Sequence, residues 1–509
     1  MGTINMRILF CVADIFLGEP HGVLQLAAIV KRDGHEVKLL ALRRQSLAQT
    51  LIQWNPDIIA YSAMSPEIPL FRVADAQVRA WAQGKRVLRV MGGAHTTYFP
   101  QILTDLELDA ICIGEGDRAF PELIRRFACN EPFSGIPNIL VPGNDLDAIP
   151  KELISNLDEL PFIDRESYYE VAPNYRFLAM RGFMTGRGCP YDCSYCHNHA
   201  FKKIFRNCGK IVRRRSVDYV LAEMQETLRQ DPHIRLIKIS DDTFAHVIDD
   251  WLIEFLDRYQ RVIKLPFYCL MRSNTLTDEM ARRLSKAGCI SIGMSVESGN
   301  ERVRNEILRR GLTDKMVMDS FANAKRYGLH TYGNTLLGLP GTTFTDDIQS
   351  FCFTKRLKMT VPTFGIFSPY PRTQLTDYAI SLGELPAGFD FQHRAQDQSP
   401  LLSFSPQEKR MQHHLTFLGT LFCGLPDMFI PAFLVLLRWP LGRFYKYIGT
   451  AYMVIKSGLF IFPNIYPRNP LRLFRLFWES IRFFTVAKIV EFSEPSSTDE
   501  SYQGRIEKI

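Results

Sequence analysis

The sequence predicts an α/β protein in which a doubly wound parallel sheet is followed by a barrel or partial barrel and then by a helical C-terminal region. Short apolar runs alternate with helical periodicity over residues 1–140 and again over residues 171–390, which is typical of parallel strands joined by crossover helices. From 391 to 492 the chain is apolar, aromatic and basic, with little strand signal. A chain of 509 residues has room for about three domains.

The first 140 residues hold five candidate strands, with helical periodicity at Val23–Arg32 and Leu70–Trp81 between them. The strands are Arg7–Val12, Val37–Ala41, Ile58–Ser62, Val87–Met91 and Ala110–Ile113. Ligands of such sheets bind at the carboxyl ends of the strands, so we expect a site in the small residues that follow them. These residues are Ser62-Ala63-Met64-Ser65, Gly92-Gly93-Ala94-His95 and Gly114-Glu115-Gly116-Asp117.

Residues 141–170 are rich in turn and acidic residues and are interpreted as a linker. The second domain follows over 171–390, with helices expected at Val217–Arg229 and Thr277–Ala287. Its candidate strands are Leu236–Ile239, Phe267–Leu270, Ile290–Ser295, Thr331–Leu337 and Thr363–Phe367. This repeated alternation predicts the barrel or partial barrel.

The composition indicates the cellular compartment and the classes of partner to expect. The net charge of +7 is modest and no nucleic-acid-binding motif is present, so no nucleic-acid partner is expected. Scattered cysteines in apolar surroundings are typical of small buried hydrophobes in a reducing cytoplasm. They are Cys11, Cys112, Cys269, Cys289 and Cys352. No signal peptide is recognised at the N-terminus, which favours a cytoplasmic protein.

The strongest signal is the run Gly-Cys-Pro-Tyr-Asp-Cys-Ser-Tyr-Cys, which places Cys189, Cys193 and Cys196 in one short loop. Three thiolates at this spacing can bind three corners of an iron–sulfur cubane. A zinc site is the alternative, with His197 or His199 as a fourth ligand, although zinc sites usually pair two cysteines with two distant ligands. Three ligands for four irons leave one iron open to a substrate or cofactor.

This run resembles the signature of the radical S-adenosylmethionine superfamily, Cys-x3-Cys-x2-Cys, with an aromatic residue, here Tyr195, before the last cysteine. The resemblance implies a partial TIM barrel and a [4Fe–4S] cluster on the three cysteines. It also implies that the open iron chelates S-adenosylmethionine and that one electron, from a donor such as flavodoxin or ferredoxin, yields a 5′-deoxyadenosyl radical.

Later segments resemble the other signatures of that superfamily. Asp241 and Asp242 end a strand where the family contacts the methionine amino group, although paired carboxylates are also common as helix caps or solvated turns. The other residues that the resemblance assigns to S-adenosylmethionine are Ser295, Glu297, Arg304 and Gly338.

The N-terminal sheet resembles the Rossmann-like cobalamin-binding domain that is fused to many radical S-adenosylmethionine enzymes. The resemblance assigns cofactor contacts to Ser62, Gly92, Gly93, His95, Gly114, Glu115 and Gly116. A generic nucleotide-binding sheet is the alternative, but no G-x-G-x-x-G follows the first strand.

Some cobalamin domains supply a histidine as the lower ligand from an Asp-x-His-x-x-Gly loop. That pattern is absent from the loop Asp14–His21, and Asp33-Gly34-His35 lies before the second strand without the later glycine. We therefore expect no histidine below cobalt and interpret His95 as a contact to a corrin side chain.

The C-terminal region contains three apolar segments. Leu415–Leu437 is long enough to span a bilayer, but Pro426 and Asp427 favour a buried or interfacial hairpin. Pro470–Val490 has aromatic residues at helical spacing with arginines on another face, which indicates either a membrane-surface helix or a helix packed on the domain. Tyr445–Phe462 is a third such segment. Residues 493–509 are expected to be disordered.

The favoured function is a cobalamin-dependent radical C-methyltransferase that acts on an unactivated carbon of a hydrophobic substrate, such as a hopanoid-type lipid. One alternative is an anaerobic radical cyclase or oxidase of a tetrapyrrole with the same architecture. Another is a membrane-associated iron–sulfur or corrinoid protein without catalysis. The enzyme is expected in the cytoplasm, with peripheral membrane contact through its C-terminal region.

Overall fold

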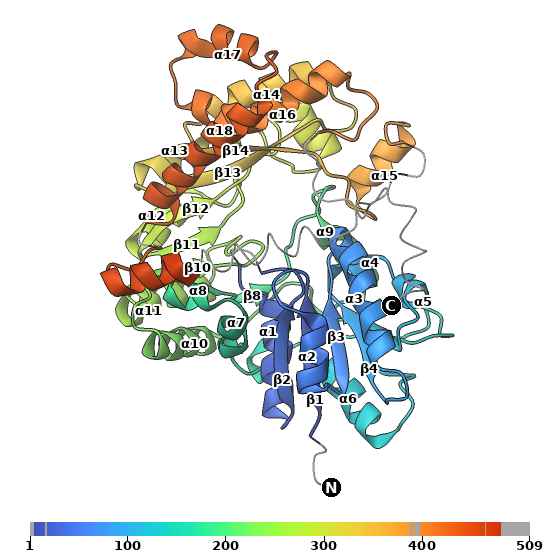
Figure 1. The fold of residues 1–509 in the computed structure, drawn as a ribbon. Helices are drawn as coiled ribbons and strands as arrows, with labels where there is room; N and C mark the ends of the chain where they lie inside the picture. Colours follow the sequence, from blue (N-terminus) through green and yellow to red (C-terminus); the bar gives the residue numbers. More distant parts are fainter. Residues whose placement is uncertain are drawn as a thin grey trace. The chain divides into compact units, whose positions relative to one another are not determined.

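The computed structural model describes residues 5–15, 18–386, 389, 391, 398–463 and 465–479, and it divides into two compact units (Figure 1). Unit 1 comprises residues 1–151, 160–177 and 469–509, and unit 2 comprises residues 152–159 and 178–468. The tail Ser493–Ile509, for which disorder was predicted, lies outside the described residues.

Unit 1 is built on a six-stranded sheet in the order β2-β1-β3-β4-β5-β6, and the prediction of a parallel doubly wound sheet is confirmed. The strands are β1 (Arg7–Val12), β2 (Glu36–Ala41), β3 (Ile58–Ser62), β4 (Leu88–Gly92), β5 (Ala110–Cys112) and the antiparallel β6 (Ile139–Leu140). The strand order reverses between β1 and β3. The carboxyl edge at this reversal is where doubly wound sheets bind their ligands.

Helices connect these strands and cover the sheet of unit 1. They are α1 (His21–Arg32), α2 (Leu47–Trp54), η1 (Ser65–Glu67), α3 (Ile68–Trp81), α4 (Ala94–Tyr98), α5 (Ile102–Asp105), α6 (Ala119–Cys129), α7 (Arg165–Val171) and α8 (Pro173–Phe177). The end of the predicted linker is helical, because Asp164 caps α7 and pairs with Lys31 of α1 at 2.6 Å.

Unit 2 contains a sheet of six parallel strands in the order β14-β13-β12-β11-β10-β7, which is the sheet of a partial barrel. The strands are β7 (Met180–Phe183), β10 (Leu236–Ile239), β11 (Phe267–Leu270), β12 (Cys289–Gly293), β13 (His330–Leu337) and β14 (Val361–Ile366). The sequence did not predict β7, because Arg181 interrupts its apolar run. Arg181 is nevertheless buried, with its guanidinium bonded to Asp231 at 3.0 Å.

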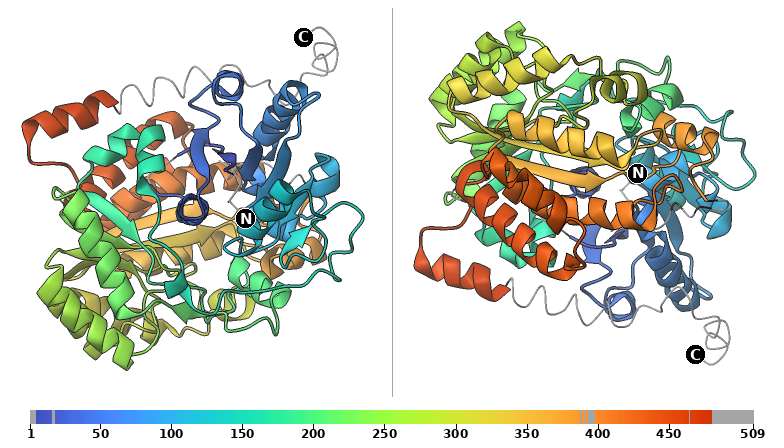
Figure 2. Two further views of the ribbon diagram at one scale, coloured as in Figure 1. Left: turned by 90° about the horizontal axis from the view of Figure 1, so that it is seen from below. Right: turned by 90° about the horizontal axis from the view of Figure 1, so that it is seen from above.

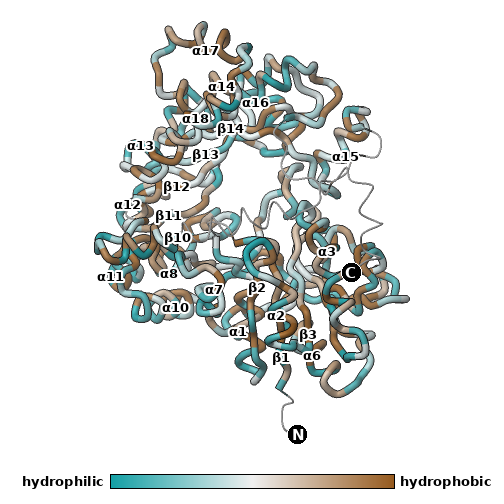
Figure 3. The backbone as a smooth tube through the Cα atoms, in the orientation of Figure 1, coloured by the Kyte–Doolittle hydropathy of each residue, from teal (hydrophilic) through white to brown (hydrophobic). Residues whose placement is uncertain are grey.

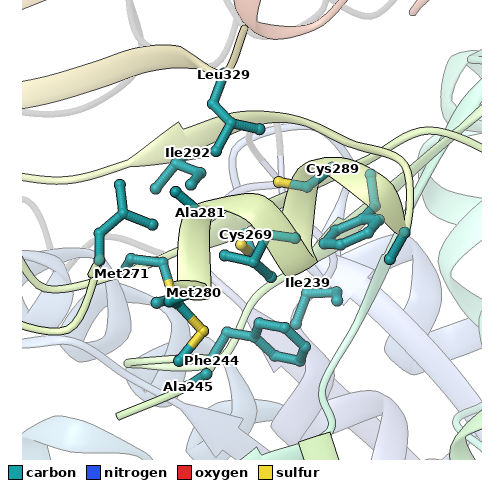
Figure 4. Packing of buried hydrophobic residues seen from close by; sticks show 14 of the residues in the cluster. Ile239, Phe244, Ala245, Cys269, Met271, Met280, Ala281, Cys289, Ile292 and Leu329 are labelled. Atoms are coloured by element: carbon teal, nitrogen blue, oxygen red, sulfur yellow. The ribbon is translucent and has the colours of Figure 1, made fainter. Parts of the chain in front are cut away.

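The helices of unit 2 begin at side-chain caps such as Ser216, Thr277 and Thr313 and alternate with the strands. They are α9 (His197–Ile204), α10 (Val217–Gln230), α11 (Asp250–Val262), α12 (Asp278–Lys286), α13 (Asp314–Arg326), α14 (Phe344–Arg356) and α15 (Gln374–Ser381). A short ladder, β8 (Gly186–Arg187) with β9 (Arg213–Arg214), and the helical segments η2 (Leu157–Glu159) and η3 (Val303–Ile307, a π-helix) complete the unit. Cys269 and Cys289 pack in the hydrophobic core (Figure 4), as the sequence predicted.

The C-terminal part of unit 2 is helical, as predicted. It contains α16 (Pro406–Cys423), η4 (Asp427–Phe429), α17 (Ile430–Leu436), α18 (Gly442–Lys456) and η5 (Ser457–Ile461, a π-helix). Helix α16 packs on β14 and α18 packs on α16 (Figure 2). Among the described residues, no helix is both long enough and apolar enough to cross a membrane. Residues 470–479 are helical, and 480–490 lie outside the described part of the chain.

Gly299 provides a test of the packing of the segment after β12 against α14. A β-carbon at this position would lie 2.6 Å from the β-carbon of Phe353 and 2.6 Å from the α-carbon of Ser350. Gly299→Ala is therefore expected to destabilise the protein by about 1–3 kcal/mol, measured as a lower thermal unfolding midpoint. Gly458→Ala, which meets no atom within 4 Å, is the matched control and should leave the midpoint nearly unchanged. Equal midpoints for the two variants would contradict this packing.

Candidate functional site

The cysteine loop of unit 2 runs from the end of β8 to the start of α9, and Cys196 is the N-cap residue of α9. Two glycines allow the chain to enter this loop. Gly188 has φ of +86°, and a β-carbon there would lie 2.4 Å from the carbonyl oxygen of Ile211. A β-carbon on Gly186 would lie 2.6 Å from the carbonyl oxygen of Arg213. The close β8–β9 ladder therefore requires glycine at both positions.

Backbone contacts fix the loop against the rest of unit 2. The Ser194 hydroxyl donates to the carbonyl of Ile307 at 2.7 Å, and the Ser194 amide donates to the carbonyl of Leu308 at 3.1 Å. The Leu375 amide donates to the carbonyl of Ser194 at 3.0 Å. Two segments that are distant in sequence therefore hold the stretch between Cys193 and Cys196 in one conformation.

His199 also holds the loop, and it uses both ring nitrogens to do so. Its Nδ1 lies 3.1 Å from the carbonyl oxygen of Cys193, and its Nε2 accepts from the Gln374 amide at 3.2 Å. With both nitrogens engaged, this histidine is not placed to be the fourth ligand of a zinc site. Among the described residues, no group of three His, Cys, Asp or Glu side chains has an arrangement that would hold a single metal ion.

Tyr195, Glu297 and Arg310 form an interaction network beside the cysteines. The Tyr195 hydroxyl lies 3.2 Å from Oε1 of Glu297, and Arg310 donates to the Tyr195 hydroxyl through Nη1. The same Nη1 lies 3.5 Å from Oε1 of Glu297, and Nη2 donates to the carbonyl of Ser295 at 2.9 Å. The network thus joins the cysteine loop to the chain that follows β12.

Glu297 occupies an unusual backbone position for a charged residue. Its φ is +68°, and it forms an isolated bridge to Thr335 of β13. Burial raises the pKa of Glu297, while Arg310 and the hydrogen bond from Tyr195 act in the opposite direction. A strained, buried carboxylate held in this way is typical of functional positions.

Two buried arginines lie near Cys193. The Arg272 guanidinium lies over the Tyr191 ring, 4.0 Å from its centroid, and donates to the carbonyl of Arg310. Cys193 contributes to the electrostatic surroundings of both Arg272 and Arg310. Among the described residues, the buried Nε atoms of these two arginines have no hydrogen-bond partner. Buried donors without a partner are costly, so the site favours an anionic or electron-rich group at this place.

The two aspartates at the end of β10 have different environments. Asp241 is buried and accepts from the Thr185 amide at 2.7 Å, from the Gly186 amide at 3.4 Å and from the Thr185 hydroxyl. Burial raises the pKa of Asp241 to about 6, although these donors oppose the shift. Asp242 is exposed and accepts from Nδ2 of Asn198 at 3.2 Å. The geometry thus gives Asp241 a role in holding β7 and β8, and it leaves Asp242 open to a ligand.

Arg304 and Gly338 also have well-defined partners. Arg304 is fully buried and donates to the carbonyl oxygens of Leu312 at 2.9 Å and Ser298 at 2.8 Å. It also pairs with Asp314. Its guanidinium is therefore engaged within the fold, and Arg310 rather than Arg304 lies beside Glu297. Gly338 has φ of +64°, and its amide donates to Asp347 at 2.9 Å.

In unit 1 the predicted site residues gather at the carboxyl ends of β3, β4 and β5. The Ala63 amide donates to the carbonyl of Gly92 at 3.1 Å, and the His95 amide donates to the carbonyl of Ala63 at 3.0 Å. Gly93 has φ of +98°, and a β-carbon there would lie 2.9 Å from the carbonyl oxygen of Ala63. The loops after β3 and β4 therefore cross at a point that admits only glycine.

The third loop of this edge is held by threonine side chains of α4. Thr97 accepts from the Gly114 amide at 3.0 Å, and Thr96 donates to the carbonyl of Cys112 at 2.6 Å. Asn138 donates to the carbonyl of Glu115 at 2.9 Å, while Gly116 meets only ordinary contacts. Small residues and backbone groups thus line this edge of the sheet, which suits a large planar ligand approaching the chain closely.

His95 is only 3 % exposed. Its Nδ1 lies 3.0 Å from the Ser65 hydroxyl, and its ring stacks on Phe99 with centroids 5.0 Å apart. Burial, with a smaller effect of Arg72, lowers the pKa of His95 to about 4. The ring is therefore neutral at ordinary pH and helps to hold the loop.

The sequence did not identify Arg272, Arg310 or Thr243 as site residues. The Thr243 hydroxyl lies 3.6 Å from Sγ of Cys189. It directly follows the Asp241-Asp242 pair, which was the signal available for finding it. The two arginines belong to no short motif, and only the fold brings them to Cys193.

Comparison with protein families identifies both units. Residues 183–352 match the radical SAM superfamily, and residues 15–124 match the B12 binding domain. The chain belongs to the cobalamin-dependent radical S-adenosylmethionine enzymes. Its cofactors are S-adenosylmethionine, a [4Fe–4S] cluster and cobalamin, as the sequence analysis expected.

Several relatives are similar over part or most of the chain. An uncharacterized methyltransferase of Pyrococcus horikoshii is 29% identical over 379 residues, which cover 72% of this chain and 79% of the relative. An anaerobic magnesium-protoporphyrin IX monomethyl ester cyclase of Rubrivivax gelatinosus is 22% identical, with coverage of 76% and 72%. A hopanoid C-3 methylase of Methylococcus capsulatus is 27% identical over 194 residues, 36% of each chain.

Two solved enzymes share the fold. The radical S-adenosylmethionine methyltransferase TsrM of Kitasatospora setae, solved with cobalamin and a [4Fe–4S] cluster bound, superposes with a TM-score of 0.61 at 16% identity, covering 75% of this chain and 79% of TsrM. The cobalamin-dependent enzyme OxsB superposes with a TM-score of 0.64 at 12% identity, covering 99% of this chain and 84% of OxsB. At these identities the comparison establishes the fold.

Asp241 and Asp242 allow a paired test of their different roles. Asp241→Asn keeps one accepting oxygen for three donors, so it should lower the stability of the protein by about 1–3 kcal/mol and reduce iron retention after reconstitution. Asp242→Asn, an exposed control, should leave the unfolding midpoint within about 0.5 kcal/mol of the original. Thermal melts and iron analysis measure both effects. Equal midpoints and equal iron contents for the two variants would show that Asp241 does not have this structural role.

His95 predicts a pH dependence of stability. Its pKa is lowered in the folded state, so folding disfavours its protonation, and stability from this residue falls as the pH drops from about 6.5 toward 4. Thermal midpoints of the protein at pH 7.5 and 5.5 should therefore differ more for the original chain than for His95→Gln. If the midpoints of the original chain and of His95→Gln changed by the same amount between the two pH values, the His95 ring would not be buried in its neutral form.

Proposed function

We propose that Cys189, Cys193 and Cys196 hold the [4Fe–4S] cluster. The observation that carries this proposal is the single short loop that contains all three cysteines and is held by hydrogen bonds from the side chains of Ser194 and His199 to backbone groups. Thiolates are the ligands that such clusters require. The partnerless Nε atoms of Arg272 and Arg310 fit a cluster as well, since an electron-rich group near Cys193 would give these buried donors a partner.

When bound, the cluster supplies the electron that cleaves S-adenosylmethionine, and cobalamin carries the methyl group. The contribution of the chain is to bind and to orient. Asp242 provides an exposed carboxylate at the end of β10, suited to a cationic amino group. Glu297 and Ser295 would provide oxygens for the sugar hydroxyls, and Arg310 keeps Glu297 in place.

We assign cobalamin to the carboxyl edge of the unit 1 sheet. Gly92, Gly93, Gly114 and Gly116 let a large ring approach the backbone there, and Ser62 offers a hydroxyl group. With its ring hydrogen-bonded to Ser65, His95 would support the loop rather than ligate cobalt.

The favoured reaction is methyl transfer to an unactivated carbon of a hydrophobic substrate. It is supported by the similarity to methyltransferases in sequence and in fold, and a hopanoid-type lipid is the proposed class because a hopanoid methylase is among the relatives. A small electron-transfer protein such as flavodoxin or ferredoxin would supply electrons.

A second candidate is cyclisation or oxidation of a tetrapyrrole. The similarity to a magnesium-protoporphyrin ester cyclase over 76% of this chain favours it. The two reactions leave different products. Methyl transfer yields S-adenosylhomocysteine together with 5′-deoxyadenosine, and cyclisation yields 5′-deoxyadenosine alone.

The cluster assignment predicts the effect of Cys193→Ala. After anaerobic reconstitution this variant should lose most of its cluster absorbance, and reductive cleavage of S-adenosylmethionine should fall at least about a hundredfold, because a thiolate ligand is lost. Cys208→Ala, a cysteine on the segment after α9, is the matched control and should keep both properties. Retention of cleavage by Cys193→Ala would refute the assignment.

The reaction itself is tested by product analysis. Reconstituted enzyme with dithionite is incubated with lipid and pigment extracts, and nucleoside products are measured by mass spectrometry. Substrate-dependent S-adenosylhomocysteine beside 5′-deoxyadenosine supports methyl transfer. Substrate-dependent 5′-deoxyadenosine without S-adenosylhomocysteine would reject methyl transfer in favour of the cyclase.

A further inference from the structure

Helix α18 carries apolar side chains on the face that points away from the protein. They lie three, four, ten and eleven residues after the first of them, spacings that fall on one side of an α-helix, and Tyr447 and Ile455 are 77% and 61% exposed. The exposed apolar residues of the helix are Phe444, Tyr447, Ile448, Val454 and Ile455. A helix on the surface of a globular domain normally turns such a stripe toward the core. The outer stripe of α18, defined by these five residues, therefore needs a separate explanation.

The inner face of α18 is already packed, so the helix cannot rotate to bury the outer stripe. The Tyr445 hydroxyl donates to the carbonyl of Leu436 at 3.0 Å, and its ring meets His414 edge-on with centroids 5.2 Å apart. A β-carbon on Gly449 would lie 2.3 Å from the carbonyl oxygen of Phe417. The chain after the helix is fixed too, because Ser291 of β12 donates to the carbonyl of Ile461 at 2.6 Å.

Further exposed apolar side chains lie on the segments that precede and follow α18 in the chain. Figure 3 shows hydrophobic segments along α17 and α18. Exposed large apolar side chains on the neighbouring elements are Met428, Phe429, Val435, Trp439, Leu441 and Leu459. Single exposed apolar residues are common, but this concentration over consecutive elements is typical of an interaction surface.

The charge of this region indicates the kind of partner. Residues 428–468 contain five basic residues and no aspartate or glutamate. Arg443 and Lys446 are exposed on α18 next to the outer stripe, and Asp427, just before the region, pairs with Lys355 at 3.3 Å. Aromatic and aliphatic residues flanked by basic ones match the acyl chains and anionic headgroups of a bilayer surface.

We propose that the outer stripe of α18 and the apolar residues around it bind the surface of an anionic lipid bilayer, with the helix lying in the interface. Long basic side chains such as Arg443 and Lys446 would reach the headgroups while the stripe enters the acyl boundary. This contact would bring unit 2 to the place where a hydrophobic substrate is dissolved. Vesicle binding requires no turnover, so membrane binding and the proposed reaction are tested independently. Either one can be refuted while the other stands.

The experiment is flotation of the reconstituted full chain with two kinds of vesicle, phosphatidylcholine alone and phosphatidylcholine mixed with phosphatidylglycerol. We expect the protein to float with the mixed vesicles and to be released as salt is raised. Tyr447→Ser combined with Ile455→Ser should reduce the bound fraction about tenfold. Met316→Ser combined with Met318→Ser, which removes two exposed apolar residues of α13, is the control and should bind as the original does.

A second variant keeps the test decisive if the serine variant folds poorly. Arg443→Gln combined with Lys446→Gln changes only exposed side chains, and it should weaken binding to the mixed vesicles severalfold. Failure of the original chain to float, or equal flotation by every variant, would overturn the proposal. If the original chain does not float but sediments as a dimer, and the serine variant sediments as a monomer, the membrane proposal is wrong. The outer stripe would then bind a second copy of the chain.

Discussion

The network of Tyr195, Glu297 and Arg310 is the interaction on which the rest of the site depends. It joins the cysteine loop to the chain after β12 and to the turn after the π-helix η3. The cysteine loop is more than a hundred residues away from the other two segments in the sequence. Glu297 and Arg310 are both buried, so neither can lose its partner cheaply. Removing one member of a buried pair costs about 3–5 kcal/mol, because the other charge is left without compensation. The position of the cysteines is therefore coupled to the folding of the barrel.

Close backbone contacts also help to position the cysteine loop. Gly186 and Gly188 let β8 and β9 approach, and Asp241 holds the same turn through the Thr185 and Gly186 amides. Unit 1 follows the same principle, since Gly93 lets the loops after β3 and β4 cross. Both units thus place small residues and backbone groups at the carboxyl edges of their sheets, where the cofactors of this enzyme class are proposed to bind.

Much of the fold followed from the sequence, because central parallel strands are apolar on both faces and stand out between polar helices. Strand β7 was missed because Arg181 lies within it and finds its partner, Asp231, only in the folded chain. The cysteine loop was predicted because its chemistry is local. The position of Arg310 beside Glu297 could not be predicted, because Arg310 belongs to no short motif and only the folded chain brings the two side chains together. Nor does the Gly-Gly-Ala-His run reveal that the His95 ring is buried.

In the proposed site, three cysteines hold a cluster with one iron left for S-adenosylmethionine. Electron paramagnetic resonance of the reduced, reconstituted enzyme tests it most directly, with S-adenosylmethionine carrying nitrogen-15 in its amino group. We predict that adding the labelled molecule changes the cluster spectrum and that a hyperfine coupling to nitrogen-15 is detected, because the amino group binds the open iron. A spectrum that saturating S-adenosylmethionine leaves unchanged, with no coupling to the label, would show that no iron of the cluster is open to the amino group.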